Sequence, residues 1–170
     1  MYEAPDSLLA VARDLGIEQR RFKQVGPGRV SPVLGKILET FTRHGAANET
    51  SLWLWEDFDE VDCVFVDPHA YRVIRQVAPP STRVWFVTED FGRRKRHGNY
   101  WLFEGELGAA LDVVENHFHF EYYVVSRKID WMIAVNHHDV VHGVGAWIGE
   151  RLSAMEAAGL VPGRLGRERR

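Results

Sequence analysis

The sequence has only one cysteine, Cys63, among its 170 residues. An internal disulfide is therefore excluded, and a reducing compartment is favoured. No apolar run reaches the ~18 residues of a membrane-spanning helix. The first residues, MYEAPDSLLAVARDLG, lack the basic and then apolar segments of a secretory signal. Together these absences predict a cytoplasmic protein.

The sequence also lacks a large excess of charge of one sign, and it lacks nucleotide-binding motifs. The formal net charge is −3, so no broad positive field would attract nucleic acid. The motifs GxGxxG and GxxxxGK[ST] are absent, and with them the usual cradles for nucleotide phosphates. Ser126 lies outside any Gly-x-Ser-x-Gly turn, and Cys63 lies in an apolar segment. Neither a catalytic triad nor a cofactor is expected.

What is present is typical of one globular domain. A chain of this length can bury about two-thirds of its unfolded surface. Hydrophobic residues make up 45% of it and charged residues 26%, which are ordinary values. No repeat or internal linker divides the chain, so we expect a single domain over residues 1–161 and a basic, flexible tail over 162–170.

The hydrophobic periodicity predicts an α+β protein. Spacings of three and four residues indicate helices over 6–15, 31–43, 67–77, 107–116 and 147–158. Apolar or alternating runs indicate strands at 52–58, 63–66, 83–88, 99–104, 117–125, 131–135 and 140–144. Most strands are adjacent in sequence, which favours an antiparallel or mixed sheet of about five to seven strands packed with about five helices.

Residues 118–145 form the longest run rich in β-branched and aromatic side chains. Within residues 117–125, polar and apolar side chains alternate, as on a strand with one mixed face. SRKID at 126–130 is predicted as a turn, so pairing across it would bring His119 and Glu121 into one sheet with the NHHD segment at 136–139. The register stays open, because a slip of one residue reverses the faces.

Two kinds of chemistry could use this histidine-rich region. The candidate metal ligands are His117, His119, His137 and His138, with Glu121 or Asp139. Their spacing matches no established zinc pattern, and solvated histidines explain it equally well.

In the second reading, His137 or His138 acts as a base, Glu121 or Asp139 orients it, and Lys128 stabilises charge. This would be a small hydrolase-like enzyme, with or without a metal. Its site would lie at the ends of the 118–145 strands.

Two further features suit binding. Arg93, Arg94 and Arg96 form a basic loop, interpreted first as a solvated turn, second as a site for an acidic protein and third as a nucleic-acid contact. Trp53 and Trp55 are most simply core residues; if exposed, they would form a contact patch.

The segments LWLWEDF (52–58), RVWFVTEDFGRRK (83–95), NYWLFEGEL (99–107) and the run from Glu121 to Gly145 are similar to those of a family of small bacterial proteins of unknown function. An acidic residue that ends the last segment in that pattern is replaced here by Ala146. The resemblance implies no activity or site residue. More loosely, the chain resembles immunity- or antitoxin-type proteins.

The preferred hypothesis is a non-enzymatic cytoplasmic module that binds another protein, with an immunity-type inhibitor as one form of it. It depends on the absence of a complete catalytic signature beside six tryptophans and a basic loop. Arg93, Arg94 and Arg96 would steer the partner, and Trp53 and Trp55 would anchor it. A homodimer joined through an aromatic sheet face is the third possibility.

Overall fold

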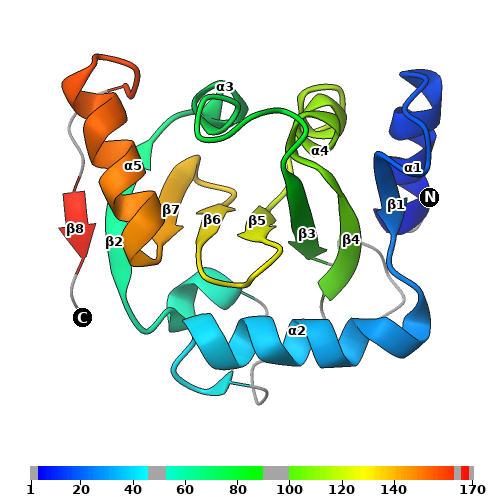
Figure 1. Ribbon diagram of the computed structural model, residues 1–170, viewed down its shortest axis with the longest axis horizontal. Coiled ribbons are helices and arrows are strands. Elements are labelled where there is room, and N and C mark those ends of the chain that lie inside the picture. The colour runs from blue at the N-terminus through cyan, green and yellow to red at the C-terminus, as the bar shows by residue number, and fades with distance from the viewer. Residues whose placement is uncertain (1–3, 46–52, 90–99, 163–165, 169–170) are drawn as a thin grey trace.

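A computed structural model describes residues 4–45, 53–89, 100–162 and 166–168 (Figure 1). Its centre is an eight-stranded sheet in the order β1-β4-β3-β5-β6-β7-β2-β8, in which all neighbouring strands are antiparallel. The strands are β1 (Phe22–Gln24), β2 (Val61–Val66), β3 (Arg83–Glu89), β4 (Tyr100–Glu106), β5 (Tyr122–Ser126), β6 (Met132–Val135), β7 (Val140–Val144) and β8 (Gly166–Glu168).

The helices are α1 (Ala4–Asp14), α2 (Pro27–Phe41), α3 (Ala70–Ile74), α4 (Leu107–Glu115) and α5 (Ala146–Ala157), with a 3-10 helix, η2 (Leu54–Asp57). The α+β class is confirmed, and six of the strands coincide with predicted ones. The two edge strands, β1 and β8, lie outside the predicted strands. Each has only three residues, too few for a pattern to show in the sequence.

Helices cover both faces of the sheet. In Figure 1, α3, α4 and α5 lie on one side of the strands and α2 runs along the other. Residues of β3 alternate between two hydrophobic clusters: Val84 and Phe86 belong to the cluster with α1, α3, α4 and α5, while Trp85 and Val87 belong to the cluster with α2. The second of these is called the α2 face below. Because both faces are covered, all but the first and last residues of β3 are buried.

The segment 52–58, predicted as a strand, contains the 3-10 helix η2 instead. The prediction of a strand was wrong for this segment. The 3-10 helix turns Leu54 and Asp57 inward while Trp53 and Glu56 stay exposed. The buried Asp57 carboxylate then accepts a hydrogen bond from the His44 backbone at 3.1 Å.

The strand predicted over 117–125 begins only at Tyr122. Residues 117–121 are irregular, so the alternation there does not define a face of the sheet. The SRKID turn is present: the Ser126 backbone N–H donates to the Trp131 carbonyl at 3.0 Å, and Ile129 has a φ of 59°. β5 and β6 pair with Tyr122 opposite Val135.

Helix α2 begins earlier than the predicted residue 31. The segment VGPG at residues 25–28 places Gly26 at the N-cap and Pro27 at the first helical position. Proline is well suited to that position because its missing N–H has no partner there in any helix. Leu34, Ile37 and Leu38 then face the sheet.

The last residues contribute to the sheet. Within the stretch expected to be a tail, Gly166–Glu168 forms β8 and pairs with β2. None of the helices in the described ranges has both the length and the apolar character needed to cross a membrane.

Candidate functional site

The predicted histidine candidates lie at two separate places. His117 and His119 precede β5 and line a hollow of about 230 Å³ with residues of α3 and α4. A His117 ring nitrogen contacts the Ser7 hydroxyl, and burial lowers the His117 pKa. His119 Nδ1 lies 3.7 Å from an Asp139 carboxylate oxygen.

His137 and His138 follow β6, and their rings are 3.9 Å apart. His137 Nδ1 lies 3.4 Å from Glu121 Oε1. Of the two histidines predicted to act with Glu121, His137 is the one that lies beside it. Within residues 4–45, 53–89, 100–162 and 166–168, no three His, Cys, Asp or Glu side chains are grouped to hold a metal ion.

Lys128 is not part of this arrangement. It lies in the turn that follows β5, whereas Glu121 precedes the first residue of that strand. Its side chain lines a different hollow, together with Trp131 and Trp147. The predicted stabilising role beside a histidine therefore has no structural basis.

Glu89 is a second partner of Glu121, and the sequence analysis did not predict it. In the register of β3 and β5, Thr88 is opposite Tyr122, so the next pair brings Glu89 opposite Glu121 on the α2 face. Burial raises the Glu89 pKa to about 9, and the hydrogen bond that protonated Glu89 donates to Glu121 and the negative charge of Glu121 raise it further. At neutral pH, Glu89 therefore keeps its proton.

Aromatic side chains surround this carboxyl pair. The His137 ring lies 5.9 Å from the Trp53 ring and 6.5 Å from that of Trp55. Trp55 stacks on His142 at 5.9 Å. Tyr123, two residues after Glu121 in the chain, has its side chain on the same α2 face. It is almost wholly buried, and this burial raises its pKa well above the ordinary value.

Trp53 and Trp55 differ in burial. The Trp53 side chain is 39% exposed, so its interpretation as a core residue was wrong. Trp55 is half-buried and packs against the cluster on the α2 face. Trp53 is exposed because η2, unlike a strand, leaves one of the two indoles outside.

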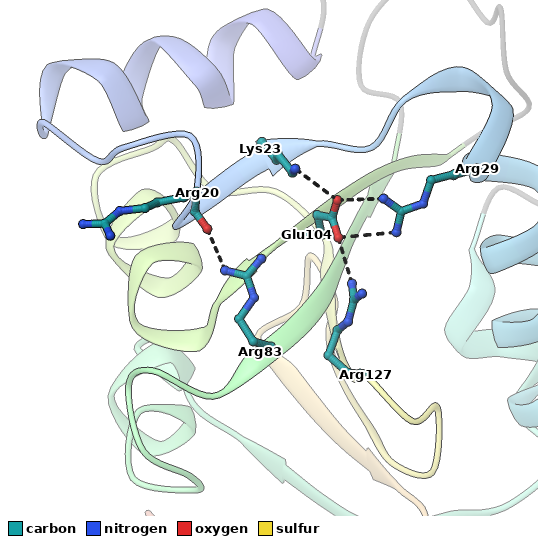
Figure 2. A network of polar contacts seen from close by, with 6 residues as sticks. All are labelled: Arg20, Lys23, Arg29, Arg83, Glu104 and Arg127. Atoms are coloured by element: carbon teal, nitrogen blue, oxygen red, sulfur yellow. Dashed lines mark hydrogen bonds and ion pairs between the residues drawn. The ribbon is translucent and has the colours of Figure 1, made fainter.

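A second polar cluster lies on the same face at the other end of β4, around Glu104 (Figure 2). Its carboxylate oxygens are 3.0 Å from Arg29, 3.0 Å from Arg127 and 3.5 Å from Lys23. Burial alone would raise the Glu104 pKa, but hydrogen bonds from Arg29 and Arg127 and the charge of Lys23 hold it below its ordinary value. These four residues are called the Glu104 cluster.

Trp85 lies beneath this cluster. The Arg127 guanidinium carbon is 3.5 Å from the Trp85 ring centroid, and that of Arg29 is 5.5 Å away. The indole is 5% exposed. Each arginine is thus held by both a carboxylate and an aromatic ring, which restricts its rotamers.

Beside the Glu104 cluster is a hollow of about 430 Å³, called the tryptophan hollow here. Trp131 and Trp147 stack in it at 5.2 Å, and Trp147 is 45% exposed. Arg83, Arg127 and Lys128 also line it, with Asp130 as the acidic member. The predicted binding residues Arg93, Arg94 and Arg96 lie outside the described residues.

The architecture and these clusters define an α+β protein with polar sites at two ends of one sheet face. Residues 6–156 match a family described as a family of unknown function, DUF6756, and the chain belongs to it. No curated protein and no solved structure matches the chain.

Proposed function

We propose that this protein is a non-enzymatic binding module and that it takes an acidic segment of another protein at the tryptophan hollow. The observation that supports this most is the lining of the hollow, where three cationic side chains adjoin an exposed indole. Arginine and tryptophan are the residues that dominate binding energy at protein interfaces.

The cationic side chains of the hollow are held in place before a partner arrives. Arg127 is fixed by Glu104 and by the Trp85 ring. Arg83 donates a hydrogen bond to the Arg20 carbonyl at 2.7 Å (Figure 2). Binding a carboxylate would therefore cost less side-chain entropy than binding with free arginines. Guanidinium groups also match the planar geometry of a carboxylate.

A protein partner is favoured over a nucleic acid because the positive charge is confined to the tryptophan hollow. The chain as a whole carries −3, and Asp130 lies among the cations of the hollow. A polyanion following a long path over the surface would meet this negative charge. A short acidic segment with an apolar neighbour could instead fill the hollow and cover Trp147.

We further propose that the module acts in the bacterial cytoplasm as an immunity- or antitoxin-type inhibitor, which blocks its partner by covering it. The lone cysteine supports a reducing compartment. The restrained arginines support a stable complex, because preorganised contacts slow dissociation.

The test uses a labelled peptide in which aspartate and leucine alternate. Charge reversal in R83E/K128E should weaken its binding by at least about tenfold and reduce the dependence of affinity on salt. Arg127 is left intact, because its loss would disturb Glu104. The matched control is R13E/K36E, which changes the same charge at exposed positions of α1 and α2. Equal affinity in both variants, or preferential binding of a DNA duplex, would refute the assignment.

One observation favours a second candidate, a hydrolase-like enzyme: the approach of His137 to Glu121 at 3.4 Å. In this reading, His137 acts as the base and Glu121 orients its ring. Generic ester and phosphoester substrates would test it. Activity that is lost in H137A and kept in H138A supports this candidate, and activity that both variants retain excludes it.

A further inference from the structure

A hollow of about 230 Å³ lies at the end of β5 opposite the tryptophan hollow, and neither function proposed above uses it. Tyr122, the first residue of β5, forms part of its wall, together with residues of α3, of α4 and of the turn between β6 and β7. It is called the Tyr122 hollow below. Drug-sized ligands occupy pockets of roughly 300–1,000 Å³, so this smaller one suits a group of the size of a side chain.

The Tyr122 side chain is buried, but its hydroxyl has no partner among the described residues. The residue is 4% exposed, and its ring stacks on that of Phe86 at 5.7 Å. No described residue forms a hydrogen bond with the hydroxyl. Burial raises the pKa of this phenol, and the nearby Asp67, Tyr71 and Asp139 raise it further, so it stays neutral. A buried hydroxyl without a partner is rare, and this one borders an open hollow where a ligand can reach it.

Asp139 adds a carboxylate to the same wall. Its nearest described partner, His119 Nδ1, is 3.7 Å away, which is longer than a hydrogen bond. The Asp139 backbone is fixed at both ends, because its N–H donates to the Asn136 carbonyl at 3.1 Å and its carbonyl accepts from the Asp67 N–H at 3.0 Å. The carboxylate is therefore held in place, while its oxygens accept no hydrogen bond from the described residues.

The rest of the lining is mostly aromatic and contains no basic side chain apart from histidine. Among the described residues of the wall, none is a lysine or an arginine. The other carboxylate, Glu115, is already paired with Arg75 at 2.9 Å. Tyr71 and Phe118 also line the hollow, and Phe118 is 60% exposed. A ligand would therefore meet one available carboxylate, one neutral hydroxyl and accessible aromatic rings.

We propose that the Tyr122 hollow binds an alkylguanidinium group, with two N–H groups on the Asp139 carboxylate and a third on the Tyr122 hydroxyl oxygen. A guanidinium presents five N–H donors in one plane, and two of them match the two oxygens of a carboxylate. It also stacks on aromatic rings and is more weakly hydrated than an ammonium. Phe118 provides such a ring at the solvent side of the hollow.

Other ligands fit this lining less well. An anion would meet the Asp139 and Glu115 carboxylates with no lysine or arginine in the described wall to balance its charge. A neutral ring would cover the Asp139 carboxylate and leave its charge uncompensated. An alkylammonium carries the charge but is strongly hydrated and lacks a planar fork. For a metal ion, the described residues provide no group of three carboxylate, imidazole or thiol ligands.

The test is titration calorimetry of the whole chain with ethylguanidinium, propylammonium and methyl phosphate. We expect saturable binding of ethylguanidinium, at least about tenfold tighter than that of propylammonium. D139N removes the charge but keeps a residue type that tolerates the left-handed backbone at this position, where φ is 60°. It should weaken binding at least about tenfold. The matched control is D59N at an exposed position, which should bind as the wild type does.

Y122F distinguishes a ligand-binding hydroxyl from a structural one. Since no described residue bonds the hydroxyl, its removal should leave the Tm unchanged or raise it. The same variant should bind ethylguanidinium about threefold to tenfold more weakly, because one hydrogen bond to the ligand is lost. A lower Tm would show that the hydroxyl has an internal partner, and this result, or unchanged affinity, would refute the proposed role of Tyr122.

Two further probes identify the source of the guanidinium. Tighter binding of an arginine blocked at both backbone ends would assign the hollow to an arginine side chain of a partner, and tighter binding of agmatine to a free small molecule; both support the proposal. Equal affinity for propylammonium, binding of methyl phosphate in place of the guanidinium, unchanged affinity in D139N, or no saturable binding of any guanidinium would overturn it. The comparison of probes uses the wild type, so it does not depend on a variant that folds.

Discussion

At the scale of single residues, two carboxyls on the same sheet face have opposite environments. Glu89 faces another carboxyl and half-buried aromatic rings, and its pKa is raised to about 9. Glu104 faces two guanidinium groups and an ammonium, and its pKa is lowered. The difference comes from the neighbours of each side chain, since both are glutamates near the ends of strands.

The raised Glu89 pKa predicts how stability depends on pH. Between its ordinary value of 4.5 and about 9, the folded state holds a proton that the unfolded chain has lost. The contribution of Glu89 to stability is therefore complete below that interval and is lost as pH rises through it. E89Q does not titrate, so its free energy of unfolding should improve relative to the wild type with increasing pH. Urea titrations across the interval measure this, with E60Q as control; parallel curves would contradict it.

Glu104 should show the opposite sign. Its lowered pKa means that the stabilisation is present above the ordinary value of 4.5 and is lost as pH falls through the folded-state value. At neutral pH, E104Q should lose about 2 kcal/mol of unfolding free energy, because buried hydrogen bonds between charged groups are broken.

The matched control for this prediction is E106Q, which removes a half-exposed ion pair with Arg21 at 2.8 Å. It should lose less than about 1 kcal/mol. Equal losses in the two variants, or a difference that persists in acid, would show that the Glu104 cluster does not stabilise the fold.

At the scale of secondary-structure elements, close packing against neighbouring elements limits the size of the side chains that a strand can hold. Gly143 of β7 pairs with Cys63 of β2, beneath α5. A methyl group at Gly143 would collide with Cys63 Sγ and lie 3.1 Å from Leu152 Cδ1. Strand β7 can therefore pass under α5 only with glycine at this position.

We expect G143A to lower the free energy of unfolding by roughly 1–3 kcal/mol, because the added methyl overpacks the α5 side of the sheet. The matched change is G35A in α2, where nothing lies within 4 Å of the new methyl. It should raise stability by about 0.5–1 kcal/mol, since alanine favours helix over glycine. Chemical denaturation of both variants checks the pair, and a neutral G143A would refute the packing argument.

At the scale of the whole molecule, the two hydrophobic clusters share one sheet. Trp85 belongs to the cluster on the α2 face and Trp131 to the opposite one, but both lie on strands or strand ends of the same hydrogen-bonded array. Neither layer of helices has a sheet of its own to pack on. The two sides should therefore unfold together.

This predicts one transition for the whole chain. Tryptophan fluorescence and far-ultraviolet circular dichroism should give coincident unfolding curves. L38A on α2 and L111A on α4 each empty a buried site on a different face, and each should shift both curves together by about 2–5 kcal/mol. Separate transitions for the two probes would contradict the shared-sheet argument.

Local patterns predicted the elements that depend on neighbouring residues. The hairpin strands at 83–88 and 99–104, helix α4 and the SRKID turn are encoded by periodicity and by turn residues close together in the chain. The pairing of His137 with Glu121 was also accessible, because both lie next to strands joined by one turn. The segment at 52–58 failed, since its apolar residues suit a strand and a buried 3-10 turn equally well.

The amino-acid sequence by itself determined the α+β class and the position of most strands, because those follow from side-chain periodicity over a few residues. Only the tertiary structure decided that Glu89 meets Glu121, that Arg29 and Arg127 converge on Glu104, and that His119 pairs with Asp139 while His137 pairs with Glu121. These contacts join segments that are up to 75 positions apart in the chain. They depend on the order of the strands and on the register in which they pair. The same local sequence patterns are compatible with more than one register, so these patterns do not determine the contacts.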